Sequence, residues 1–152
     1  MELHSPAFKQ GTAIPRKYAR KGENLLPPLR WTGAPREAKS FALVVEDPDA
    51  PSGMFRHWGV HGIGADMNEL PEGAGRGDGR IGAEVLNDFG DKYYDGPEPP
   101  RGSGAHHYRF RLAALDTENL DLPANAKVED LWRAAQPHIL DEADLVGMFE
   151  QR

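Results

Sequence analysis

The abundance of glycine and proline is the feature that most restricts how this chain can fold. The two residues supply 17 and 13 of the 152 positions, about a fifth, where average usage would give nearer an eighth. Both interrupt regular helices and favour turns. The sequence therefore predicts a turn-rich, mainly β protein rather than a helical bundle. The length suits a single core, so we expect one domain over residues 1–152.

Three segments have the pattern of β-strands. Residues 39–46 are rich in β-branched and aromatic side chains and are bounded by turn-forming residues. Residues 57–63 fit a second strand, although Gly59 and Gly62 weaken the pattern. Residues 106–115 alternate with a period of two, which places His106 and Tyr108 on the same face as the apolar residues that follow. The alternation predicts a strand with one apolar face that is polar at its beginning.

One segment has a clear helical pattern. In residues 127–136, apolar side chains recur at the spacing i, i+3, i+4 and i+7, which forms one stripe on a helix. Pro137 is expected to end this helix. The local pattern of residues 139–149 fits a short helix or a strand equally well.

The charge and the absence of cysteine exclude several classes of function. Asp and Glu number 24 against 18 Lys and Arg, so the formal charge of −6 disfavours nucleic acid as a partner. The lack of cysteine excludes disulfides, thiolate nucleophiles and cysteine-containing zinc motifs. The apolar runs are too short for a transmembrane segment, and the first residues do not resemble a secretory signal. These features predict a cytoplasmic protein.

The candidate site residues lie at strand ends. Asp47 and Asp49 belong to a DPDAP turn directly after the first predicted strand, and its prolines could stiffen the loop that aims a carboxylate. His57 and His106 each begin a strand, and Tyr108 shares a face with His106. Imidazoles and a phenol donate hydrogen bonds to an anion, whereas two His and two Asp could instead bind zinc or manganese. Each residue alone also fits an ordinary structural role, and the spacing does not decide between these possibilities.

Two longer blocks carry a family resemblance. They are DPDAPSGMFRHWGVHGI at 47–63 and YDGPEPPRGSGAHHYRF at 94–110. In this order they resemble the signatures of the phosphatidylethanolamine-binding proteins, also called Raf kinase inhibitor proteins, and in particular the bacterial and archaeal branch. The similarity extends over nearly the whole chain. It implies a large antiparallel sheet packed on a smaller one with a few short helices, and it makes residues 139–149 a strand.

The resemblance also implies a ligand-binding site. The matching positions are Asp47, Asp49, His57, His106 and Tyr108, together with Gly96 as a backbone N–H donor. The family's arginine after the second histidine is replaced by His107, which the strand alternation directs away from the pocket.

These observations predict a non-enzymatic protein that binds phosphate or a phosphorylated head group and needs no cofactor or metal. No base can be placed from the sequence beside Ser52 or Ser103, which favours binding over catalysis. A metal-dependent hydrolase that uses the Asp and His residues is the alternative. The resemblance also raises the regulation of a partner, a kinase or another enzyme, and a homodimer, but no residue of the chain identifies either.

Overall fold

The fold consists of two antiparallel sheets, one α-helix and two short 3-10 helices. A computed structural model describes residues 1–152. The smaller sheet has the strand order β1-β2-β5 and the larger one β6-β4-β3-β7-β8. The elements are β1 (Glu2–His4), η1 (Arg16–Tyr18), β2 (Leu29–Thr32), β3 (Ser40–Asp47), β4 (Phe55–Gly64), β5 (Glu69–Leu70), β6 (Ala83–Glu84), β7 (His106–Leu115), α1 (Val128–Ala135), η2 (Gln136–His138) and β8 (Ile139–Phe149). The predicted mainly β fold with two packed sheets is confirmed.

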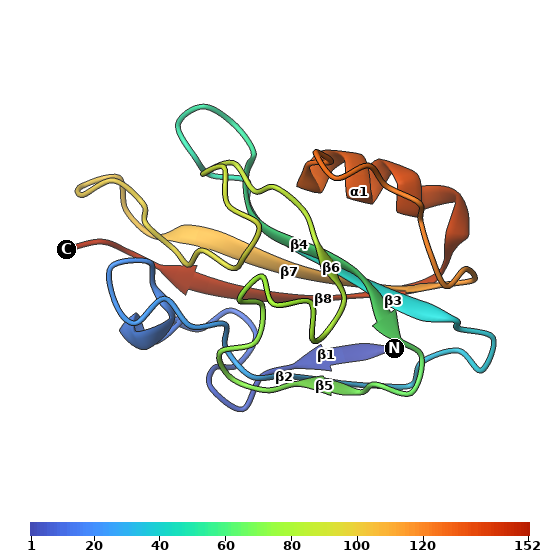
Figure 1. Cartoon of the computed structure of the whole chain (residues 1–152). Helices are drawn as coiled ribbons and strands as arrows, with labels where there is room; N and C mark the ends of the chain where they lie inside the picture. Colours follow the sequence, from blue (N-terminus) through green and yellow to red (C-terminus); the bar gives the residue numbers. More distant parts are fainter.

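The larger sheet is covered on both faces. Figure 1 shows α1 on one side of it and the smaller sheet on the other. Leu112 belongs to the core between the two sheets, whereas Ala113 and Leu115 pack with Leu131 of α1. All eight residues of β3 are therefore buried, which explains why its middle, residues 41–45, is a continuous apolar run rather than an alternating one.

The helix and the last strand agree with the sequence. Helix α1 begins after Lys127, whose backbone N–H donates to the Asp130 carboxylate at 2.9 Å, a favourable place for a negative charge. Pro137 lies in η2, where the chain turns into β8. The predicted helix over 127–136 and the strand over 139–149 are both confirmed. None of the helices has the length and apolar character needed to span a bilayer.

The register of β3 and β7 positions the candidate site. These antiparallel neighbours pair Glu46 with Arg109, so Asp47 at the end of β3 lies beside the beginning of β7. Strand β4 begins on the other side of β3, where Asp47 pairs with Phe55. The end of one central strand and the beginnings of its two neighbours therefore meet at one edge of the sheet.

A pair of leucine substitutions tests this core. Leu112→Ala removes a fully buried side chain and should lower the free energy of unfolding by about 2–5 kcal/mol. Leu140→Ala makes the same change at a side chain that is 40% exposed, and should cost less than about 1 kcal/mol. Urea unfolding measures both. Equal losses would contradict the burial assigned to β7.

Candidate functional site

A pocket lies at the edge of the larger sheet where β3 ends and β4 and β7 begin. The loops over 48–54 and 97–105 extend from this end of the sheet (Figure 1). The cavity has a volume of about 300 Å³. Four of the six predicted ligand-binding residues line it: Asp47, His57, His106 and Tyr108. The remaining wall is largely apolar and is formed by residues such as Phe55, Phe89, Pro51 and Pro100.

Asp47 and His106 form a buried pair in this pocket. Each residue is only 3% exposed, and His106 Nδ1 lies 2.7 Å from Asp47 Oδ2. Because a carboxylate only accepts hydrogen bonds, Nδ1 carries a proton and donates a hydrogen bond to Asp47. The other Asp47 oxygen accepts the backbone N–H of Asp49 at 2.8 Å. A buried carboxylate requires such partners, so the turn and the histidine together stabilise it.

His57 is held in a different way. Its Nδ1 lies 2.9 Å from the backbone carbonyl oxygen of Asp95, so this nitrogen also carries the proton. That is the only hydrogen bond of the ring, and the neutral ring has its lone pair on Nε2. Burial lowers the pKa of His57 from its ordinary value, with the Asp95 carbonyl opposing the shift. His57 is therefore neutral at pH 7.

The hydroxyl of Tyr108 is buried without a hydrogen-bond partner. Burial raises the pKa of this phenol, and the charge of Asp47 raises it further, so the group stays protonated. A buried polar group without a partner costs about 1–3 kcal/mol. In a pocket wall, such a group is a ready donor for a ligand.

The ring of His57 is packed in an aromatic cluster. The centroid of its ring lies 5.1 Å from Phe55, 5.4 Å from Phe89 and 5.3 Å from Tyr108, in each case edge to face. The guanidinium of Arg20 stacks on Phe89 at 4.0 Å. These contacts fix the orientation of the imidazole and leave its Nε2 as the free position.

Sequence reasoning missed the residues that support His57 from behind. The Asn87 side-chain amide donates to the His57 carbonyl at 3.0 Å and to an Asp95 carboxylate oxygen at 2.8 Å. Asn87 and Asp95 are 5% and 2% exposed. Both lie in the stretch NDFGDKYYDG, in which no local pattern indicates their role.

Asp49 does not lie in the pocket. Its Oδ2 accepts the His107 backbone N–H at 2.8 Å and lies 2.6 Å from His107 Nδ1. These hydrogen bonds lower the pKa of Asp49, with the backbone bond as the largest cause. The assignment of Asp49 to the ligand site is therefore corrected: it fixes the DPDAP turn to β7. His107 is exposed and points away from the pocket, as the alternation predicts.

The backbone N–H of Gly96 is also unavailable to an anion. It donates to the Asn24 side-chain oxygen at 2.7 Å. A Cβ at this position would lie only 1.9 Å from the Tyr18 carbonyl oxygen. Close packing of two backbone segments explains the glycine here, and the predicted role in ligand binding is corrected.

The residues proposed for a metal do not converge. No three His, Asp or Glu side chains of the chain are placed to hold a metal ion together. Asp49 is directed toward His107, and the Nδ1 atom of His106 is bonded to Asp47. The four residues of the hydrolase alternative therefore do not form one coordination sphere.

The surroundings of Ser103 differ from those that the sequence predicts. Its Oγ lies 3.0 Å from His106 Nε2. The expectation that no base stands beside this serine is wrong, because the 97–105 loop folds back onto the beginning of β7. Ser52 lines the pocket but makes no hydrogen bond to either histidine.

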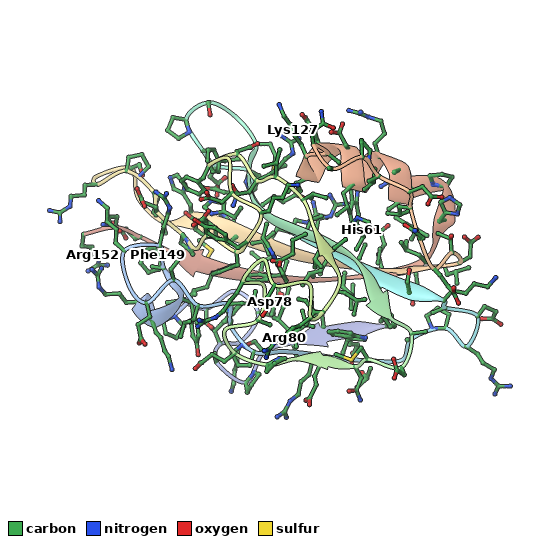
Figure 2. The ribbon with its side chains drawn as sticks, in the orientation of Figure 1. His61, Asp78, Arg80, Lys127, Phe149 and Arg152 are labelled. Carbon is green, nitrogen blue, oxygen red and sulfur yellow. The ribbon has the colours of Figure 1, made fainter.

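A larger cavity of about 590 Å³ lies elsewhere and includes His61, which Figure 2 shows on the larger sheet. Two of its charged groups, Glu84 and Lys92, are already paired with the protein. Glu84 accepts from the Trp58 indole at 2.7 Å and from the Gly77 backbone, and Lys92 donates to the Ala124 carbonyl. The smaller pocket at the sheet edge is the better candidate because two of its polar groups, His57 Nε2 and the Tyr108 hydroxyl, have no hydrogen-bond partner in the protein.

Fold and pocket together define a two-sheet β protein with a buried Asp–His pair at one edge of its larger sheet. The sequence matches the family described as Phosphatidylethanolamine-binding protein over residues 4–150. The chain belongs to this family.

Relatives and solved structures agree with this assignment. A protein of Methanothermobacter thermautotrophicus named UPF0098 protein is 46% identical, and the match covers 99% of each chain. The crystal structure of YbcL from E. coli, described as a new member of the mammalian PEBP family, has a TM-score of 0.92 at 33% identity and covers 99% of this chain and 98% of its own. A carboxypeptidase Y inhibitor, solved in complex with its proteinase, has a TM-score of 0.57 at 17% identity, covers 93% of this chain and 76% of its own, and shares the fold alone.

The surroundings of His57 can be tested by NMR. The imidazole should titrate with a pKa below 6.5, because burial disfavours its charged form. Above that pKa the neutral ring should carry its proton on Nδ1, which donates to the Asp95 carbonyl oxygen. A ¹⁵N-edited titration of the imidazole signals, with His57→Gln to assign the resonance, measures both properties. A pKa above 6.5, or a neutral ring protonated on Nε2, would contradict the geometry.

Proposed function

We propose that the pocket binds a phosphate group, either as free phosphate or on a phosphorylated head group. The observation that carries the proposal is the pair of polar groups without partners. The Nε2 of His57 and the hydroxyl of Tyr108 belong to residues of one small cavity, and neither group is hydrogen-bonded to the protein. A ligand with several oxygen atoms and a mobile proton is suited to both groups.

Asp47 raises the main objection, because a carboxylate in the wall would repel an anion. Its two oxygens are already bonded to His106 and to the Asp49 backbone. Glu98, which also lines the pocket, lies 3.2 Å from the Arg20 guanidinium. The charges of both carboxylates are thus partly compensated by the protein, which lowers the repulsion.

Binding should be accompanied by the uptake of a proton. Since His57 Nδ1 already donates to Asp95, a hydrogen bond at Nε2 requires a proton either on the imidazole or on the phosphate. The complex therefore contains one proton more than neutral His57 and a phosphate dianion. By linkage, the affinity should increase as the pH falls toward the lowered pKa of His57.

Calorimetric titration of the metal-free protein with inorganic phosphate and with O-phosphorylethanolamine tests this proposal. Both should bind, and Tyr108→Phe should weaken binding about tenfold or more, since a hydrogen bond to a charged group contributes about 1.5–3 kcal/mol. Tyr93→Phe is the matched control: it removes a phenolic hydroxyl from a tyrosine that is 41% exposed and lies outside the pocket. This variant should bind as the unchanged protein does.

A parallel titration with zinc separates the two candidate functions. Binding of the anions without metal supports the phosphate site. Tight zinc binding, with anions bound only in its presence, would overturn the proposal in favour of a metal-dependent site. Equal weakening by Tyr108→Phe and Tyr93→Phe would place the anion outside this pocket.

A further inference from the structure

Ser103, His106 and Asp47 form a chain of hydrogen-bonding side chains at the rim of the pocket. Ser103 Oγ lies 3.0 Å from His106 Nε2, and His106 Nδ1 lies 2.7 Å from Asp47 Oδ2. A hydroxyl on one nitrogen of an imidazole, with a carboxylate on the other, is the arrangement that activates a serine nucleophile. A phosphate pocket does not require this order of groups.

A serine nucleophile must be accessible to the substrate, whereas the histidine and carboxylate that activate it can be buried. Asp47 and His106 are each 3% exposed, whereas Ser103 is exposed on the loop that precedes β7. The two glycines beside the serine have φ values of +81° at Gly102 and +84° at Gly104, which side chains with a Cβ rarely adopt. They allow the loop to turn sharply, so that the serine reaches back to His106.

The tautomer of neutral His106 allows this residue to act as a base. Since Nδ1 donates to Asp47, neutral His106 has its lone pair on Nε2, which faces the serine. The single proton of the Ser103 hydroxyl has two acceptors within reach: Nε2, and the Pro100 carbonyl oxygen at 2.7 Å. When it lies toward Nε2, the oxygen is prepared for nucleophilic attack.

Backbone donors are also free next to the serine. The N–H groups of Gly104 and Ala105 make no hydrogen bond within the protein. In serine hydrolases, the N–H of the residue after the nucleophile commonly stabilises the oxyanion that forms during acyl transfer. Gly104 occupies that position in this chain.

We propose that the protein hydrolyses esters of short-chain carboxylic acids through Ser103, with His106 as general base and Asp47 as the residue that orients it. Ser103 Oγ attacks the ester carbonyl carbon while its proton passes to His106 Nε2. The tetrahedral intermediate then expels the alcohol, which takes this proton from His106. Water, deprotonated by His106, attacks the acyl-serine, and the released acid and the restored serine complete the cycle.

The pocket indicates the class of substrate. Its cavity of about 300 Å³ has Phe55, Phe89 and Pro100 in its wall, so it suits a small apolar group rather than a long chain. Ser103 contacts both Pro100 and His106 of this wall. This inference does not rest on phosphate binding, because it depends on Nε2 of His106 and not on His57 or Tyr108.

Hydrolysis of p-nitrophenyl acetate and p-nitrophenyl butyrate provides the test, together with labelling by a fluorophosphonate. The unchanged protein should release p-nitrophenol roughly 100-fold faster than Ser103→Ala, and mass spectrometry should locate the fluorophosphonate adduct on Ser103. Ser103→Ala retains His106, so the comparison corrects for ester cleavage by imidazole alone. His106→Gln should abolish both the turnover and the labelling.

Ser5→Ala is the matched control. The Ser5 hydroxyl also donates to a proline carbonyl, that of Pro28 at 2.6 Å, but it lies away from the pocket. This variant should retain the full rate. Equal rates for the unchanged protein and Ser103→Ala, or an adduct on another residue, would overturn the proposal. Phosphate titration of Ser103→Ala tells the two proposals apart, because loss of esterase activity with intact phosphate binding concerns only the serine.

Discussion

The hydrogen bond between the buried carboxylate of Asp47 and the imidazole of His106 is the interaction on which the pocket depends. It joins the end of β3 to the beginning of β7, and the antiparallel register of these strands places its two partners side by side. Without the histidine, a buried carboxylate would lose its main partner, at a cost of about 3–5 kcal/mol. The bond also fixes the proton on Nδ1, and this determines what Nε2 of His106 can do. The orientation of the DPDAP turn follows as well, because Asp47 accepts the N–H of Asp49.

The two pocket histidines have different partners and therefore different chemistry. His106 donates to a carboxylate, which stabilises the imidazolium whenever it forms. His57 donates to a carbonyl group inside an aromatic cluster, and burial keeps it neutral. His106 is thus the better base for the hydroxyl of Ser103, whereas His57 Nε2 is suited to accept a hydrogen bond from a ligand that brings its own proton. This division is what the two proposals require: an anion bound in one small cavity and a nucleophile at its rim.

Much of the fold could be predicted because its main strands have strong local patterns. The alternation in 106–115 correctly gave the bounds of β7 and the direction of His107. Strands β1, β5 and β6 have two or three residues, too few for any periodicity, and they form only because partner strands are present. The assignment of the last strand needed the family resemblance, since its apolar residues fit a helix equally well.

The candidate site was predictable only in part, for a physical reason. Asp47, His57, His106 and Tyr108 lie in or next to strands, so their faces follow from the backbone. Loop residues have no such constraint. Asp49 turns to a backbone N–H that lies 58 residues further along the chain.

The same limit applies to the residues that hold the site in place. The N–H of Gly96 is taken by Asn24, and Ser103 reaches His106 through a glycine turn. Asn87 and Asp95 act through a network that only the folded chain assembles.

A crystal structure of the protein with O-phosphorylethanolamine tests the central claim most directly. Phosphate oxygens should lie within about 3.2 Å of His57 Nε2 and of the Tyr108 hydroxyl. An ordered ligand that contacts neither group, or one bound in the larger cavity beside His61, would contradict the account.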